Sequence, residues 1–278
     1  MTEAHRLTRL FPLPTTSVAH KGCYLSVPLV EPHSDDLFLY ANFVSSLDGR
    51  IALADADSGK QSVPGATANS RDWRLFQELA AHADILITSG RYLRQFAAGT
   101  AQDMLPVGTA DGFADIRAWR REHGLKPQPD VAVLSSSLDF TVPAILQEQG
   151  RRVHVFTAAT APDRLRRMHE RAGAQVHTAA EIQRVAGEQI KRELTRLGYR
   201  RAYCVTGPCV VHTFLAAGVL DALFLTTVHT ILGGEDFSTI AEGAALSPPA
   251  DYALTWLYHD AEASRGGSQT FARYDRRG

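Results

Sequence analysis

Strand-length apolar runs alternate with helix-length segments through most of this 278-residue chain, and that alternation limits the fold more than any other feature. Between residues 130 and 173 the order is strand, helix, strand, helix, read from DVAVLS, VPAILQEQG, RVHVFTA and PDRLRRMHERAG. The run LFLYANFV, over residues 37–44, is apolar almost throughout, as expected of a strand buried on both faces. This order is typical of a parallel sheet covered by helices.

The pattern extends in both directions along the chain. Ser70 is a candidate cap for a helix, and the strand ADILITSG follows that helix and ends at Gly90. Residues 94–129 hold a short charged helix, which we place outside the sheet. The later elements are a helix over 181–197, a strand over 201–205, a helix over 208–217, a long strand over 220–231, and a hairpin of strands near 252–260 and 269–275.

We therefore predict an α/β fold with a mostly parallel, helix-covered sheet and an antiparallel C-terminal hairpin. Residues 1–36 are rich in proline and lack a sustained period, so we expect an N-terminal arm that lies over a domain surface or is partly disordered. Residues 37–278 form one predicted domain, which at 45% hydrophobic residues in the chain can bury a sizeable core.

Composition excludes several classes of partner. A formal net charge of -1 gives no basic field to attract nucleic acid or an anionic membrane surface, so we expect neither as a partner. No apolar run reaches the roughly 20 residues of a bilayer span, and the N-terminus lacks a hydrophobic signal core. Three cysteines without a CxxC pair, and histidines without HxxxH spacing, favour a reduced, cytoplasmic protein that binds no metal.

The segment Thr206-Gly207-Pro208-Cys209 joins a predicted strand to a predicted helix. Gly207 allows close backbone approach to a ligand, and Pro208 suits the first helical position. The N–H groups of Cys209, Val210 and Val211 would then face an anion such as a pyrophosphate. A plain connecting turn is the alternative interpretation.

A second strand ends at Gly90, and in open α/β sheets ligands bind beyond such ends. Thr88 and Ser89 could add hydroxyl donors there, while the alternative is a glycine that serves only a positive φ angle. Arginine binds phosphate well through its forked donors, although most single arginines are solvated surface residues. The candidates for a phosphate contact are Arg50, Arg71, Arg91 and Arg94.

Two polar residues accompany the apolar strand 37–44. The Asn42 amide would be unsatisfied inside that strand unless it met a ligand or a neighbouring backbone group. Asp48, in SLDG, either fixes a loop as part of a polar cluster or simply forms an Asp-Gly turn. His212 and His229 are interpreted as structural residues with hydrogen-bond partners.

Over residues 37–275 the chain resembles the reductase domain of riboflavin biosynthesis, the C-terminal half of the bacterial bifunctional deaminase-reductase. The resemblance rests on the ordered combination of SLDG, the TGP turn, AGxxDxLxL and ILGG. It implies a dihydrofolate-reductase-like fold, NADPH as cofactor, and reduction of a phosphoribosylamino-pyrimidine to its ribitylamino form. No HxE with PCxxC precedes the region, so a stand-alone reductase without the deaminase half is implied.

The resemblance also implies roles for individual residues. Asn42 and Asp48 would form the floor of the catalytic site, and Gln61, Arg71 and Val205 would lie on the substrate side. The implied cofactor-binding residues are Val44, Thr88, Ser89, Gly90, Arg91, Thr206, Gly207, Pro208, Cys209, Val210 and Val211. The strand that leads to Gly233-Gly234 would lie beside the site.

The chain departs from the family pattern at the substrate side. Val205 stands where the family has the acid of Glu-Gly-Gly-Pro, and the Asp-Asp-Pro segment after the second strand is missing. Alternatives to the riboflavin intermediate are therefore a different small substrate, or a non-catalytic nucleotide-binding paralogue. The long apolar strand over 220–231, interpreted as an uncovered edge, together with the family's habit, predicts a homodimer.

Overall fold

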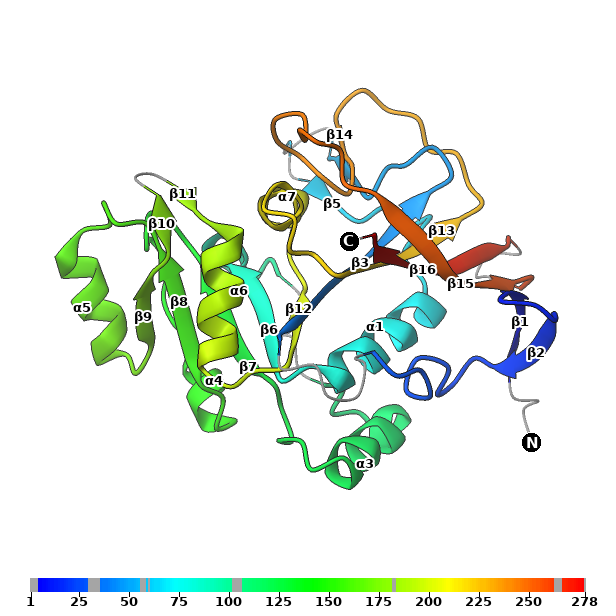
Figure 1. Cartoon of the computed structure of the whole chain (residues 1–278), viewed down its shortest axis with the longest axis horizontal. Helices are drawn as coiled ribbons and strands as arrows, with labels where there is room; N and C mark the ends of the chain where they lie inside the picture. The colour runs from blue at the N-terminus through cyan, green and yellow to red at the C-terminus, as the bar shows by residue number, and fades with distance from the viewer. Residues whose placement is uncertain are drawn as a thin grey trace.

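An eleven-stranded sheet runs through the computed structural model, which describes residues 5–29, 36–55, 59, 61–101, 107–181, 184–262 and 267–277 (Figure 1). Its strands are β1 (Arg6–Phe11), β2 (Thr16–Ala19), β3 (Phe38–Ser46), β6 (Ile85–Ser89), β7 (Asp130–Leu134), β8 (Val153–Thr157), β9 (Gln175–Thr178), β12 (Arg201–Cys204), β13 (Ala222–Val228), β15 (Tyr252–Asp260) and β16 (Gln269–Arg276). Their spatial order is β2-β1-β15-β16-β13-β3-β12-β6-β7-β8-β9. From β13 to β9 all neighbours are parallel, whereas β16, β15, β1 and β2 pair antiparallel. The predicted fold class is confirmed.

Helices cover both faces of the parallel part. They are α1 (Ser70–His82), α2 (Gly90–Ala97), α3 (Ala114–Glu122), α4 (Ala144–Glu148), α5 (Asp163–Arg171), α6 (Gly187–Arg196) and α7 (Pro208–Ala216), with a 3-10 turn, η1, at Asp111–Phe113. Leu79 of α1 packs with Tyr40 and Tyr203 on one face, whereas Val211 of α7 packs with Leu39 on the other. Strand residues alternate between the faces, so successive residues enter different cores.

Two small sheets complete the architecture. One contains β14 (Phe237–Ser238), β4 (Ala52–Ala54) and β5 (Gln61–Ser62), and in Figure 1 it lies above α7 and β3. The other pairs β10 (Ala180–Glu181) with β11 (Arg184–Val185). Within the described ranges, no helix combines the length and the apolar character needed to cross a membrane.

Several element boundaries differ from the predictions. Asn69, not Ser70, caps α1, because its Oδ1 accepts hydrogen bonds from the backbone N–H groups of Arg71 at 3.1 Å and Asp72 at 2.9 Å. Gly90 begins α2 rather than ending the preceding strand. The helix predicted over 181–197 begins only at Gly187, since residues 180–181 and 184–185 form a short strand pair.

The strand predicted over 220–231 is shorter and lies elsewhere in the sheet than expected. β13 spans seven residues and pairs with β3 on one side and β16 on the other, so it is not an edge. The edge argument for a dimer is therefore wrong, and Gly233 and Gly234 lie in the following loop at positive φ angles of 67° and 93°. The dimer itself stays a prediction.

The sheet also gains strands that the sequence patterns did not indicate. Residues 6–11 and 16–19, in the proline-rich arm, form β1 and β2, and β1 pairs with β15. β9 is short and half polar, and it pairs with β8 at the opposite edge. β1 depends on a partner near the other end of the chain, whereas β9 depends on β8, the preceding strand of the sheet.

Candidate functional site

The candidate site lies where the parallel strands β3, β12 and β6 reach their carboxyl ends. β12 is inserted between β3 and β6, and its last residue, Cys204, pairs with Ala41 on one side and Ile87 on the other. The chain continues from β12 into α7 on one face of the sheet and from β6 into α2 on the other face. Ligands of open α/β sheets bind at such a divergence of connections.

The turn into α7 keeps space for a ligand. Gly207 is the N-cap at φ -68°, and a Cβ added to it would meet no atom within 4 Å. The N–H groups of Val210 and Val211 were predicted to face an anion, but they donate to the Gly207 carbonyl at 3.1 and 3.4 Å and are therefore not free. Among the described residues, the N–H of Cys209 has no such partner, so it remains a donor at the start of the helix.

The start of α2 combines a cap, a close contact and a free cation. Ser89 caps the helix by accepting from the Tyr92 N–H at 3.3 Å. Gly90 has no positive φ, so the alternative of a glycine that serves only a positive φ angle is wrong. The glycine is instead needed for space, because an added Cβ would stand 2.8 Å from Ser135 Oγ. The Arg91 side chain is exposed and has no ion pair within the part of the chain that the structure describes. Thr88 is fully buried, and its hydroxyl oxygen has no hydrogen-bond partner among the described residues.

The side-chain oxygen of Asn42 accepts a hydrogen bond from another side chain, whereas the sequence analysis named only a ligand or a neighbouring backbone group as its partner. The Tyr203 hydroxyl donates to Asn42 Oδ1 at 2.9 Å, and burial raises the pKa of Tyr203, which keeps that donor protonated. The Tyr203 ring is stacked on Tyr40 with centroids 4.8 Å apart. The Asn42 amide nitrogen has no partner among the described residues, so Asn42 presents a fixed donor at this face.

A carboxyl group that the sequence analysis missed lies beside this pair. Asp72, in the first turn of α1, has a buried Oδ1 without a hydrogen-bond partner in the described part of the chain. Burial raises its pKa to about 6, against a hydrogen bond from the Thr226 side chain that lowers it. Thr226 pairs with Val44 of β3, so these residues meet at the same end of the sheet. The sequence signal was an acid in a first helical turn, which normally indicates only capping.

Asp48 is occupied by contacts within the protein. Its Oδ1 accepts from Ser46 Oγ at 2.5 Å and from the Leu232 N–H, and its Oδ2 accepts from the Gly233 N–H at 2.9 Å. The hydrogen bond from Ser46 and those from the loop backbone lower its pKa, and Arg50 pairs with it at 3.1 Å. The carboxylate therefore ties the turn after β3 to the loop after β13, which is the loop-fixing role predicted as one alternative.

The arginines differ in how far they are committed to other groups. Arg71 pairs at 2.6 Å with Asp260, which is buried, so its guanidinium joins α1 to β15. Arg50 donates to the Gly233 carbonyl at 2.9 Å and lies over the Phe237 ring. Arg94 donates to the Asp139 carbonyl at 2.7 Å. Arg91 is therefore the best placed of the four for a ligand phosphate.

Val205, Gln61, His212 and His229 complete the set of residues singled out from the sequence. The Val205 N–H donates to the Ile87 carbonyl at 3.0 Å, and its half-buried side chain packs with the core that contains Tyr203. Gln61 is in β5, and its buried Oε1 has no partner within the described ranges. His212 and His229 each have a hydrogen bond at 2.7 Å, to the Ala244 carbonyl and Ser268 Oγ, as expected of structural residues.

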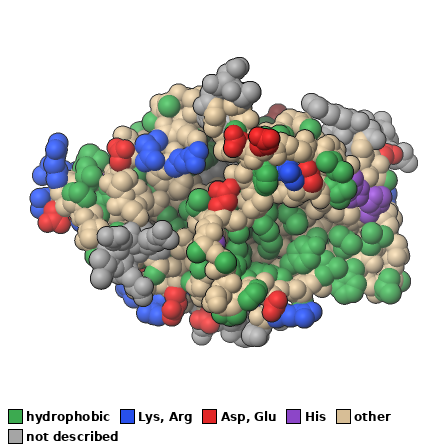
Figure 2. Space-filling view, turned by 90° about the horizontal axis from the view of Figure 1, so that it is seen from above, with side chains coloured by type: hydrophobic (Ala, Val, Ile, Leu, Met, Phe, Trp, Pro, Cys, Tyr) green, Lys and Arg blue, Asp and Glu red, His purple; other side chains and the backbone are tan. Residues whose placement is uncertain are grey.

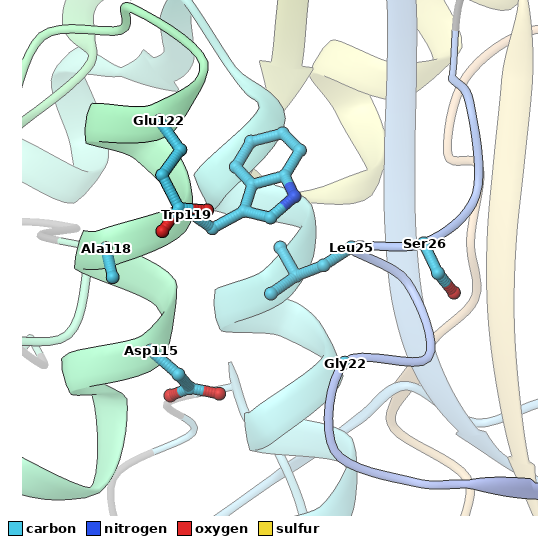
Figure 3. A pocket seen from close by; sticks show the side chains of 7 residues that line it. All are labelled: Gly22, Leu25, Ser26, Asp115, Ala118, Trp119 and Glu122. Atoms are coloured by element: carbon cyan, nitrogen blue, oxygen red, sulfur yellow. The ribbon is translucent and has the colours of Figure 1, made fainter.

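A hollow of about 480 Å³ lies at the other end of the sheet (Figure 3). Leu25 of the N-terminal segment and Trp119 of α3 face each other across it, and Asp115 and Glu122 line the α3 side. Arg201, the first residue of β12, lines the adjoining hollow, which places both at the amino ends of the parallel strands. The predicted site residues lie elsewhere.

Comparison with solved structures identifies known proteins with a similar fold. A pyrimidine reductase-like protein from Corynebacterium diphtheriae has a similar structure, with a TM-score of 0.68 and 20% identity over 94% of this chain and 100% of its own. RibD from Acinetobacter baumannii follows with a TM-score of 0.57 and 17% identity over 88% of this chain, and the match covers 59% of RibD. Rib7, the riboflavin biosynthesis reductase of Saccharomyces cerevisiae, gives a TM-score of 0.54 and 11% identity over 89% of this chain and 93% of its own.

These identities show a shared fold. No curated protein sequence matches the chain significantly. The family described as RibD C-terminal domain matches residues 37–260, which include every strand of the parallel part and all the predicted site residues. By that match the chain belongs to the RibD C-terminal domain family, which has a dihydrofolate-reductase-like fold and includes NADPH-dependent pyrimidine reductases.

Proposed function

We propose that the chain is an NADPH-dependent reductase acting on a phosphoribosylamino-pyrimidine or a related heterocycle. The observation that supports this most directly is the pair of helix starts, α7 and α2, on the adjacent strands β12 and β6. The open space at Gly207, the donor N–H of Cys209 and the exposed Arg91 suit the phosphates of a dinucleotide. These residues belong to the segments that the family match covers.

NADPH, when bound, supplies the hydride for the reduction. In the phosphoribosylamino reaction the hydride adds to the ribose carbon that bears the amino nitrogen, the bond from that carbon to the ring oxygen opens, and a proton goes to that oxygen. The protein orients the two reactants and excludes water. Arg91 would hold a cofactor phosphate, and the Asn42 amide, fixed by Tyr203, would hold a polar group of the acceptor.

One observation favours the two alternatives to the riboflavin reaction, which are a different small substrate and nucleotide binding without catalysis. Val205 offers no hydrogen bond where the family has an acid, and a donor left without its partner costs about 1–3 kcal/mol. This favours a reductase with a different small substrate, or a nucleotide-binding protein without catalysis. Substrate turnover separates these alternatives from the riboflavin reaction.

The test measures NADPH binding and NADPH oxidation with the same preparations. NADPH fluorescence should increase with wild-type protein, and Gly207→Val should abolish the increase because the new side chain would occupy the open space without meeting protein atoms. Gly112→Val is the matched control, since Gly112 also has open space around it and lies in η1, outside the site. Unchanged NADPH binding by Gly207→Val would refute the cofactor assignment. If the wild-type protein binds NADPH but does not oxidise it in the presence of any pyrimidine, the non-catalytic alternative is favoured.

A further inference from the structure

A chain of hydrogen-bonded polar side chains runs across the parallel strands to the β9 edge of the sheet, apart from the candidate site. Its members come from β7, β8, β9, α6 and the residues that follow α6. In order they are Asp130 of β7, Tyr199, His154 of β8, His177 of β9 and Glu193 of α6. The chain therefore joins the edge strand to a helix and to the interior of the sheet.

Every contact in this chain is within hydrogen-bond distance. The Tyr199 hydroxyl lies 2.9 Å from Asp130 Oδ2 and 2.8 Å from His154 Nε2. His154 Nδ1 lies 3.0 Å from His177 Nε2, and His177 Nδ1 lies 3.2 Å from Glu193 Oε1. The His177 and Glu193 side chains remain 16% and 24% exposed, so protons from solvent can reach that end of the chain.

Both ends of the chain can only accept hydrogen bonds. Burial would favour the neutral acid at Asp130, but hydrogen bonds from Lys126 and Arg152 lower the pKa of this carboxyl group. The hydrogen bonds from Arg196 lower the pKa of Glu193. Both groups are therefore carboxylates at neutral pH, and a carboxylate has no proton to donate.

The chain needs one more proton than its neutral members supply. Four contacts each require a hydrogen, whereas Tyr199 and the neutral rings of His154 and His177 supply one each. Burial raises the pKa of Tyr199, so its hydroxyl donates to Asp130 and must accept from His154. In a neutral pair, two lone pairs would face each other either between the rings or between His177 and Glu193. One additional proton removes that conflict.

We propose that the His154–His177 pair binds one proton, which completes the chain and fastens the edge strand β9 to α6, and that the pair releases this proton to solvent as the pH rises. Release leaves His177 Nδ1 facing the Glu193 carboxylate with no hydrogen between them, so the attachment of β9 to α6 weakens. The contact distances in the structure are those of the completed chain. This inference does not rest on the proposed function.

Burial and charge act on the pair in opposite directions. Burial lowers the pKa of His177 and lowers that of His154 to about 4, so two protons cannot be held together. The Glu193 carboxylate acts to raise the pKa of both rings. The single proton is therefore favoured by the chain and opposed by burial, which makes it releasable rather than permanent.

Other charged groups around the pair come from β7, β8 and α6. Among the described residues they are Asp130, Arg152, Glu193 and Arg196, beside the Tyr199 hydroxyl. Each arginine is paired with one of the carboxylates, Arg152 with Asp130 at 2.8 Å and Arg196 with Glu193 at 2.6 Å. Neither arginine therefore repels the protonated pair as an isolated charge.

The test counts ring N–H groups by NMR in the full-length protein labelled with ¹⁵N-histidine, because the ¹⁵N shift distinguishes a protonated ring nitrogen from an unprotonated one. At pH 5 His154 and His177 should together carry three ring N–H groups, and at pH 8 they should carry two, with one step between. Glu193→Gln should show two at both pH values, because the glutamine amide can donate to His177 Nδ1 without an added proton. Hydrogen-exchange protection of the β9 amides, corrected for intrinsic pH dependence, should fall about threefold over this range in the wild type only.

The control variant makes the same charge change on the same helix. Glu188→Gln removes an exposed α6 carboxylate that pairs with Arg192 at 2.6 Å, and it should retain the wild-type step and the loss of β9 protection. The signals of His82, which is buried and lies 2.8 Å from the Tyr24 carbonyl, should be the same in all three proteins and report correct folding. Two ring N–H groups at pH 5 in the wild type, three at pH 8, or an unchanged step in Glu193→Gln would each overturn the proposal.

Discussion

Replacing Asp72 by asparagine should change the stability of the protein, relative to the wild type, more favourably at neutral pH than at acid pH. Burial raises the pKa of Asp72 from 3.8 to about 6, so the folded protein holds the proton more tightly than the unfolded chain does. Stability from this group is fully present below the unfolded pKa and is lost as the pH rises through the folded pKa. Between pH 4 and pH 7 the wild-type protein should therefore lose stability that Asp72→Asn keeps.

The size of this effect follows from the pKa. A rise from 3.8 to about 6 corresponds to about 3 kcal/mol at neutral pH, at about 1.4 kcal/mol for each tenfold change in acidity. The asparagine amide is also buried there and carries its own cost, but that cost does not change with pH. The pH-dependent part of the difference between the two proteins is thus the quantity to measure, and it corresponds to roughly 6 °C in Tm for a domain of this size.

The assay is thermal or urea unfolding of both proteins at pH 4.5, 6 and 7.5. The free-energy difference, variant minus wild type, should grow by about 2 kcal/mol from the lowest to the highest pH, because about 1 of the 3 kcal/mol is already present at pH 4.5. Other titrating groups are common to both proteins and cancel in the difference. Asp163→Asn, an exposed acid in a first helical turn, should show no such growth. A difference that stays constant with pH would refute the claim that the Asp72 carboxyl is buried and has no cationic partner among the described side chains.

The remaining predictions concern the cofactor, the substrate and the assembly. Arg91→Ala should weaken NADPH binding about tenfold, or about 1.4 kcal/mol, and leave NADH binding unchanged; equal effects on the two cofactors would contradict a contact with the 2′-phosphate. Wild-type turnover of the riboflavin intermediate should be weak and Val205→Glu should raise it, whereas a wild-type kcat/KM of order 10⁴ M⁻¹s⁻¹ or more would show that the valine is no obstacle. Light scattering should give a homodimer that Leu254→Glu weakens, and a wild-type monomer of 30.4 kDa at micromolar concentration would refute it.

The structure gives the dimer prediction a different basis from the one in the sequence. Leu223 and Leu225 alternate along β13 with Phe224 and Thr226, which face α1, so the two leucines face away from that helix and are only half-buried. Leu254 and Leu257 of β15 also remain accessible. Figure 2 shows hydrophobic side chains gathered in a hollow in the right half of the molecule, where Figure 1 places β13, β15 and β16. A surface of this kind on a sheet is typical of an interface.

Local patterns in the sequence determined the fold class and the positions of most elements. Apolar runs such as LFLYANFV and glycines such as Gly150 and Gly173 act on the residues next to them, so strand and helix identities could be predicted from short windows. The turn from β12 into α7 was located for the same reason, because Gly207 and Pro208 specify a helix start without help from distant residues.

Tertiary structure alone decided which side chains remain available to a ligand. Arg71 and Asp48 carry suitable groups, but partners about 190 residues away, Asp260 and Gly233, occupy them. Asp72 has an unremarkable place in the sequence, and only the approach of β13 and β12 to α1 buries its carboxyl group, whose Oδ1 has no hydrogen-bond partner among the described residues. Burial and hydrogen-bond partnership are properties of contacts between distant segments, so a sequence window contains the residue types of a site without showing which of them are free to act.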